Sequence, residues 1–306
     1  MTGTYPQPLI MLFKMKRLLL FTATAVCTLA VSCKQESVPS VAPSGTEEIV
    51  FTANDTFSAE VSTKTSIITS LESTGFNASA TTGTSSETML WNNASFSHAS
   101  GQYKGNRYWP VTNNGIHFYA SNAAITFNAN GCSVNGVSAK DKDVVCAYLA
   151  SPSWGVANQL TFEHIFARIG SVSVSAPTGY SVTSLNISFT PNISGDYNIK
   201  TKTWSNEAAD TSSPSKKIAS SASTNDNNLW IIPGSYTLTA TYTLEKGTGD
   251  GKYSESFTKT ANVTIQAGKL NSIQTTLPEG NAAEIQFTVS VTPWGNNSIT
   301  AVFAAS

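Results

Sequence analysis

The residues best suited to acid–base or metal chemistry are three histidines, which lie far apart in the sequence as His98, His117 and His164. No H-x-x-x-H or C-x-x-C spacing occurs in the chain, and these are spacings that common zinc sites use. His164 alternates with Phe162 and Phe166 along one face of an expected strand. We interpret it as a structural imidazole that has a hydrogen-bond partner. The sequence therefore predicts neither a metal site nor a cofactor.

Three carboxylates, Asp141, Asp143 and Glu163, are the candidates for a paired acid and base. Glycoside hydrolysis needs two carboxyl groups at a defined separation, which one sequence does not set. The chain also lacks a G-x-S-x-G elbow and a glycine-rich phosphate loop, which serve acyl and phosphoryl chemistry. We predict no catalytic residues and no enzyme activity.

Cys33 is the cysteine whose surroundings indicate a modification. It follows the basic pair Lys16-Arg17, an uncharged apolar run and two small residues, which is the order of parts in a secretory signal. We predict a signal peptide over 1–32, with the true start at Met15, and a lipidated Cys33 that holds the mature protein on the outer membrane. The alternative is a secreted protein that is cut elsewhere, in which Cys33 is an ordinary thiol.

Two further cysteines, Cys132 and Cys146, lie in the body of the chain. An exported protein meets conditions in which disulfides persist, so the two residues are candidates for a bridge. Their spacing fits two unconnected thiols as well, because the geometry of a disulfide cannot be deduced from sequence separation. Both alternatives stay open.

Charge is scarce in this chain: charged residues make up 12% of it, and the net charge is -1. Globular proteins contain about 25% charged residues, whereas here Ser, Thr, Asn and Gly fill the polar positions, as in β-rich extracellular proteins. So little charge provides no broad field for nucleic acid, and we predict no nucleic-acid partner. Residues 33–46 contain two prolines and no apolar periodicity, which predicts a flexible tether after the lipid.

The elements that position these residues are strands, because short segments of alternating apolar and polar residues follow one another from Glu47 onward. The clearest of these segments are 49–51, 116–120, 162–169, 182–189, 236–244, 257–265 and 270–277. Turn-forming residues separate them, as in the hairpin tip at 245–251, and no segment keeps a helical period. We predict an all-β fold of two sandwich domains, 47–158 and 159–306, although a join near 177–179 fits equally well.

Several motifs in this order resemble those of the fimbrillin-like, or Mfa-like, fimbrial proteins. They are Trp91, Tyr108-Trp109-Pro110, Ile116-His117-Phe118-Tyr119-Ala120, Asp143-Val144-Val145-Cys146-Ala147, residues 160–169, residues 265–277 and Val289-Ser290-Val291-Thr292-Pro293-Trp294. The resemblance covers nearly the whole mature chain. It implies a lipoprotein precursor of a type V pilus, with two tandem transthyretin-like, Greek-key β-sandwich domains and other pilus subunits as partners.

The resemblance also implies assembly by donor-strand exchange, in which a protease removes an N-terminal strand and a neighbouring subunit fills the groove. In this chain the strand to be lost is expected within 47–61, with the cut near Lys64. The expected donor is 298–305, where Ile299, Ala301 and Phe303 share one face. Stalk subunits are often cut after arginine, which is absent between Cys33 and Arg107, so an uncut anchor or accessory subunit is the alternative. A stalk, tip or base role is not assigned.

A cluster of aromatic residues offers a second interpretation. Trp91, Tyr108 and Trp109 could stack on sugar rings, which would suit a monomeric surface lipoprotein that binds glycan. The same rings commonly fill the core of a β-sandwich, with only a polar tip at the rim. A host glycan or protein receptor is therefore a candidate partner in addition to other subunits.

Overall fold

The structure is a computed structural model that describes residues 45–54, 68–112, 115–211, 216–220, 229–280, 282–293 and 301–304. These ranges are built from β-strands, as predicted, and they contain no α-helix. A short 3-10 turn, η1 (Gly249–Gly251), lies at the tip of a hairpin. No helix in the described ranges has the length and apolar character needed to cross a membrane.

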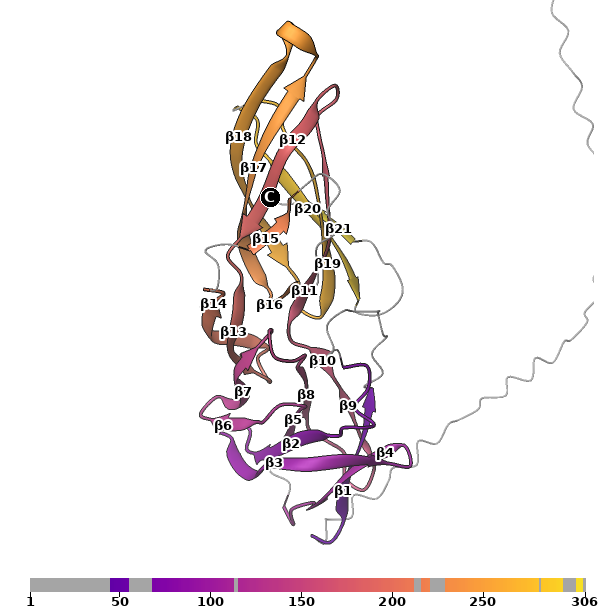
Figure 1. Cartoon of the computed structure of the whole chain (residues 1–306). Helices are drawn as coiled ribbons and strands as arrows, with labels where there is room; N and C mark the ends of the chain where they lie inside the picture. Colours follow the sequence, from indigo (N-terminus) through magenta and orange to yellow (C-terminus); the bar gives the residue numbers. More distant parts are fainter. Residues whose placement is uncertain are drawn as a thin grey trace, which may run out of the picture. The chain divides into compact units, whose positions relative to one another are not determined.

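The first sheet contains eight strands, in the spatial order β10-β8-β5-β2-β3-β4-β1-β9 (Figure 1). Their bounds are β1 (Glu48–Asn54), β2 (Phe76–Thr82), β3 (Thr88–Ala99), β4 (Gln102–Tyr108), β5 (Ile116–Ser121), β8 (Val145–Ala150), β9 (Asn158–Thr161) and β10 (Glu163–His164). Most of the long strand β3 pairs with β2, and its last residues pair with β4.

The first sheet folds over on itself to enclose a core. Four strand spacings separate β1 from β5, which would place them about 19 Å apart in a flat sheet. Instead, the ring centroids of Phe51 in β1 and Phe118 in β5 lie 5.0 Å apart. Both rings belong to one buried cluster with Phe76, Phe96 and Tyr103. The two arms of the sheet, joined through β3, thus form the two layers of a sandwich.

Two further sheets face each other across a second core. One has the order β15-β12-β17-β18 and the other β16-β11-β19-β20-β21. Their bounds are β11 (Ala167–Ser175), β12 (Ser181–Phe189), β15 (Lys216–Ala219), β16 (Leu229–Ile231), β17 (Gly234–Lys246), β18 (Tyr253–Ile265), β19 (Lys269–Thr276), β20 (Gln286–Pro293) and β21 (Ala301–Ala304). Alternate residues of these strands, among them Ile187, Tyr242, Ile273 and Phe287, are buried together.

A smaller sheet, the third sheet, combines strands from both halves of the sequence in the order β14-β13-β7-β6. Its strands are β6 (Thr126–Asn128), β7 (Gly131–Ser138), β13 (Asn192–Asn198) and β14 (Thr203–Ala209). Its buried cluster includes Val134 from β7 and Tyr197 from β13. No local pattern in the sequence predicts this sheet. The predicted boundary between residues 158 and 159 falls inside β9, which pairs with β1, and the domain division stays a prediction.

Most predicted strands are present, and one needs correction. The hairpin around 245–251 is confirmed, because β17 and β18 pair along their whole length. The segment 162–169, predicted as one strand with two distinct faces, instead contributes to two strands, β10 and β11. Strand β10 pairs with β8, whereas β11 pairs with β16 and β19. The chain changes its pairing partners between the two strands, and this explains why residues of both expected faces are buried.

Candidate functional site

Strand β1 lies inside the first sheet, with a paired strand on each side (Figure 1). It runs antiparallel to β4, with Val50 opposite Lys104 and Phe51 opposite Tyr103. On its other side it runs parallel to β9, with Phe51 opposite Asn158. Because neighbouring strands lie about 4.8 Å apart, removal of β1 would leave a gap of roughly 10 Å with two unpaired edges. We call the position of β1 between β4 and β9 the β1 slot.

The inward face of β1 is part of the core. Ile49 is 1% exposed and Phe51 is fully buried. The Phe51 ring lies 5.0 Å from the rings of Phe96 and Phe118 and 6.1 Å from that of Phe76, and we call this pocket the Phe51 site. Burial of each of these two side chains contributes about 1.5–3 kcal/mol to the free energy of unfolding. Any strand that occupies the β1 slot therefore needs apolar side chains at alternate positions.

The three aromatic candidates for glycan contact differ in exposure. Trp109 is 1% exposed, and its ring stacks on that of Trp154 with the ring centroids 4.6 Å apart. The Trp109 ring is therefore not accessible to a sugar. Trp91 is half-buried, and the guanidinium of Arg107 lies 5.7 Å from its ring. Tyr108, at 51% exposed, is the most accessible of the three. Core packing thus accounts for Trp109, whereas Trp91 and Tyr108 keep accessible surface.

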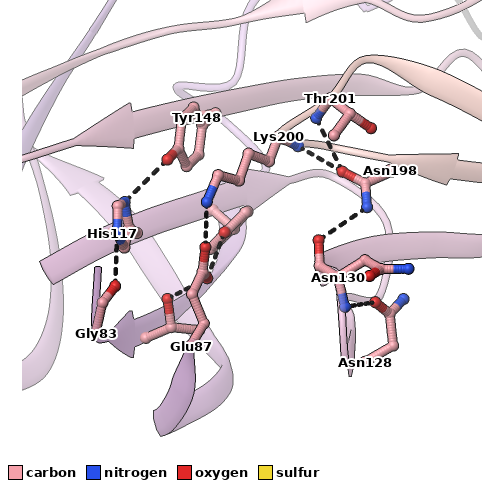
Figure 2. Close-up of polar contacts among 11 residues, drawn as sticks. Gly83, Glu87, His117, Asn128, Asn130, Tyr148, Asn198, Lys200 and Thr201 are labelled. Atoms are coloured by element: carbon pink, nitrogen blue, oxygen red, sulfur yellow. Dashed lines mark hydrogen bonds and ion pairs between the residues drawn. The ribbon is translucent and has the colours of Figure 1, made fainter. Parts of the chain in front are cut away.

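A polar cluster around Glu87 joins the first sheet to the third sheet (Figure 2). The Glu87 carboxylate accepts hydrogen bonds from Thr81 Oγ1 at 2.6 Å, Tyr119 OH at 2.5 Å and Lys200 Nζ at 2.5 Å. Burial alone would raise the pKa of Glu87, but the bonds from Lys200, Thr81 and Tyr119 outweigh it and lower that pKa. Glu87 and Lys200 are 113 positions apart, and no local sequence signal pairs them.

His117 extends this cluster on the side of β8, as Figure 2 shows. Its Nε2 lies 3.2 Å from the carbonyl oxygen of Gly83, and its Nδ1 lies 2.9 Å from the hydroxyl of Tyr148. A carbonyl can only accept, so the neutral ring carries its proton on Nε2 and accepts from Tyr148 at Nδ1. The Lys200 ammonium lies 5.9 Å from the Tyr148 ring centroid. These internal contacts make the cluster a connection between sheets.

His164 and Asp143 form a second polar contact, inside the core. His164 Nδ1 lies 2.8 Å from Asp143 Oδ2, and both side chains are almost fully buried. The same carboxylate oxygen accepts the backbone N–H of Ile68 at 3.1 Å. The prediction that His164 is a structural imidazole with a partner agrees with this geometry. Among the described residues, no group of three or more His, Cys, Asp or Glu side chains is arranged to hold a metal ion.

Cys132 and Cys146 are free thiols, both buried. The bridge that the sequence left open is therefore absent from the structure, and the two residues lie on different strands, β7 and β8. The Cys146 thiol donates instead to Ser121 Oγ at 3.5 Å. Burial raises the pKa of each thiol to about 12, so neither is a nucleophile at neutral pH.

The remaining predicted sites lie partly outside the described residues. Cys33, Lys64 and Ile299 fall outside them altogether. Ala301 and Phe303 lie in β21, whose backbone pairs with β20 at the end of its sheet (Figure 1). Their roles in lipidation, processing and strand donation stay predictions.

The chain matches the model of one protein family, described as fimbrillin-like, over residues 42–294. No curated protein of similar sequence matches it.

Three solved structures match this chain over most of its length. A proposed cell adhesion protein from Parabacteroides distasonis is 10% identical, with a TM-score of 0.46, and the match covers 83% of this chain and 98% of that one. A fimbrial assembly protein from the same species is 12% identical, with a TM-score of 0.36 and coverage of 84% and 98%. A proposed cell adhesion protein from Bacteroides ovatus is 12% identical, with a TM-score of 0.37 and coverage of 82% and 99%.

Proposed function

The chain belongs to the fimbrillin-like family, and from this premise we propose that it is a subunit of a cell-surface fimbrium, with a structural and adhesive role rather than an enzymatic one. Neighbouring subunits join by donor-strand exchange at the β1 slot. Its partners are other pilus subunits, and the finished polymer lies outside the outer membrane.

The observation that carries this proposal is the placement of β1 between β4 and β9. A strand in this position can leave only if another replaces it, because two rows of backbone groups and the Phe51 site would otherwise be open to water. A strand from a neighbouring subunit restores both the hydrogen bonds and the apolar contacts. A head-to-tail contact propagates into a fibre when its rotation does not close a ring, and we propose this open geometry for the subunit.

The proposal includes the export route that the sequence predicts. The signal peptide over 1–32 is removed, Cys33 is lipidated, and the subunit is held on the outer membrane. A cut near Lys64 then separates β1 from the rest of the chain, so that β1 is held by non-covalent contacts alone. A subunit that is never cut keeps β1 in place and serves as an anchor or accessory component.

A receptor-binding role is the second candidate, and the exposed surface of Tyr108 together with half-buried Trp91 favours it. Glycan or receptor binding that is lost in Tyr108→Ala and Trp91→Ala variants would support this role. If the protein also stays monomeric after cleavage, the monomeric glycan-binding lipoprotein replaces the fimbrial subunit.

The experiment uses the mature chain, 33–306, with Cys33→Ser to prevent lipidation and a sequence-specific protease site in place of residues 60–64. The uncut protein should stay monomeric in light scattering. After the cut, it should form high-mass species that resist detergent without heating. The matched control is the same cut chain without 298–306, which should remain monomeric. A cut full-length chain that never oligomerises would contradict strand exchange.

A further inference from the structure

A polar cavity of about 400 Å³ lies at one end of the first sheet. The start of β2, the end of β5 and the start of β8 meet at this end, because β5 runs antiparallel to both of the other strands. The segment 68–77 contributes most of the lining, and Ser95, Asn122 and Lys142 complete it. The volume falls within the range of small-molecule sites, about 300–1,000 Å³. We call this cavity the Lys142 pocket.

The Lys142 pocket carries an unpaired positive charge. Among the described residues that line it, Lys142 alone is charged, and it comes from the loop between β7 and β8. Within the described ranges Lys142 forms no ion pair, although Asp141 and Asp143 flank it in the sequence. The Asp143 carboxylate instead contacts His164 and the Ile68 amide. The pocket therefore suits a ligand that has a single negative charge.

Hydroxyl groups supply most of the remaining polar lining. They belong to Thr69, Ser70, Ser73, Thr74 and Ser95. A hydroxyl both donates and accepts hydrogen bonds, as the hydroxyls of a sugar do, whereas a phosphate group mainly accepts them. Half-buried Ile68 adds an apolar surface for the less polar face of a sugar ring. This mixture matches a hydroxylated anion better than a bare one.

Hydrogen bonds hold the walls of the pocket in place. Asn122 Nδ2 donates to the carbonyl oxygen of Asp143 at 2.9 Å, and Asn122 Oδ1 accepts the backbone N–H of Val145 at 2.9 Å. On another wall, the Gly75 N–H closes a turn by donating to the Leu71 carbonyl oxygen at 2.7 Å. Gly75 has a φ of +65°, and a Cβ there would lie 2.2 Å from a carbonyl oxygen of β3, so this turn needs glycine. Walls that are already fixed reduce the ordering cost of binding.

Resting on the adhesive role proposed above, we propose that the Lys142 pocket binds an acidic sugar, a uronic or sialic acid unit of a receptor glycan. The sugar carboxylate pairs with the Lys142 ammonium, and the sugar hydroxyls bond to Ser73, Ser95 and the other hydroxyls of the pocket. A fimbrium that carries several copies of the pocket binds a glycan surface with avidity, so weak binding by each pocket suffices. The site is separate from Tyr108 and Trp91, neither of which lines it.

Sugar binding by the uncut chain tests the pocket without polymerisation. The protein is the mature chain 33–306 with Cys33→Ser, and titrations followed by saturation-transfer NMR measure its affinity for N-acetylneuraminic acid and for glucuronic acid. Galactose and inorganic phosphate are the control ligands. At least one acidic sugar should bind, about 10-fold or more tightly than galactose and more tightly than phosphate. Equal binding of galactose, or tighter binding of phosphate than of either acidic sugar, would overturn the proposal.

Variants of the chain test the role of the ammonium group. Lys142→Gln should weaken binding of the acidic sugar at least about 10-fold, because it removes a hydrogen bond between charged groups. Lys142→Arg keeps the charge and should retain more of the affinity. Lys217→Gln is the matched control and should have no effect, since Lys217 is an exposed lysine of β15. Unchanged affinity in Lys142→Gln would overturn the proposal.

The remaining outcomes separate the Lys142 pocket from the proposed function. Loss of sugar binding in Tyr108→Ala or Trp91→Ala, with Lys142→Gln unaffected, would place the sugar at the aromatic residues and overturn the pocket. Polymerisation after the cut is measured separately. A chain that polymerises but binds no acidic sugar keeps the fimbrial role and overturns the pocket, whereas a chain that does neither contradicts both.

Discussion

Lys200 donates a hydrogen bond of 2.5 Å from Nζ to Oε1 of Glu87, and this contact links the third sheet to the first sheet. Glu87 directly precedes β3, and Lys200 lies in the turn between β13 and β14. The Glu87 side chain is 9% exposed, whereas that of Lys200 is 37% exposed. A carboxylate this buried depends on its donors, because few water molecules can replace them.

Glu87→Gln should lower the free energy of unfolding by about 1–3 kcal/mol, since it removes the charge that Lys200, Thr81 and Tyr119 stabilise. Urea unfolding followed by tryptophan fluorescence measures the change. The control is Glu163→Gln, which breaks the exposed ion pair with Lys202. An exposed pair contributes about 0–1 kcal/mol. Equal losses in the two variants would show that burial of Glu87 adds nothing.

The same carboxyl group should make stability depend on pH. Its pKa is lowered in the folded protein, so the ionised form favours folding. This contribution is fully present above the ordinary glutamate pKa of 4.5, and it is lost as the pH falls through the lower pKa of the folded state. The difference in unfolding free energy between wild type and Glu87→Gln should therefore be constant near neutral pH and shrink below pH 4.5. A difference that grows on acidification would contradict this assignment.

The local pattern of the sequence predicts strand β1, but it does not predict the Glu87 cluster. The apolar run Ile49-Val50-Phe51 favours a strand, because β-branched and aromatic residues are enriched there. The neighbours of β1, strands β4 and β9, follow from long-range pairing, which alternation does not encode. The pairing of Glu87 with Lys200 joins a loop to a turn, where no periodicity exists. The division of 162–169 between β10 and β11 escapes the local pattern for the same reason, since a change of pairing partner leaves the apolar pattern almost unbroken.

Phe51→Ala should cost about 3–5 kcal/mol of unfolding free energy, because it empties a pocket between three rings. Chemical denaturation of the uncut protein measures this loss. Thr52→Ala, on the half-buried outer face, is the control and should change stability by no more than about 0.5 kcal/mol. In the cleaved chain, Phe51→Ala should also speed the release of β1. Unchanged stability would mean that the first core does not need β1.

The thiols of Cys132 and Cys146 should resist alkylation in the native protein. Both are buried, and the pKa of each is raised to about 12, so the reactive thiolate is rare at pH 8. Labelling of a Cys33→Ser chain with iodoacetamide, followed by mass spectrometry, should show no rapid modification until denaturant is added. Fast labelling of either cysteine without denaturant would contradict its burial. A mass two hydrogens lower, with no labelling after denaturation, would reveal a disulfide.

Asp143 should be a sensitive carboxylate, because it is buried and accepts two hydrogen bonds. It accepts from both His164 Nδ1 and the Ile68 amide, and an alanine at this position removes an acceptor from one buried and one partly buried donor. We expect Asp143→Ala to lower the free energy of unfolding by at least about 1–3 kcal/mol for the unsatisfied groups. The nearby Asp141 is exposed, so Asp141→Ala provides the control and should have little effect. Because the contact with Ile68 holds the chain just before β2, hydrogen exchange at 68–75 should rise in Asp143→Ala. Exchange that stays at the wild-type level would mean that this segment is held by other contacts.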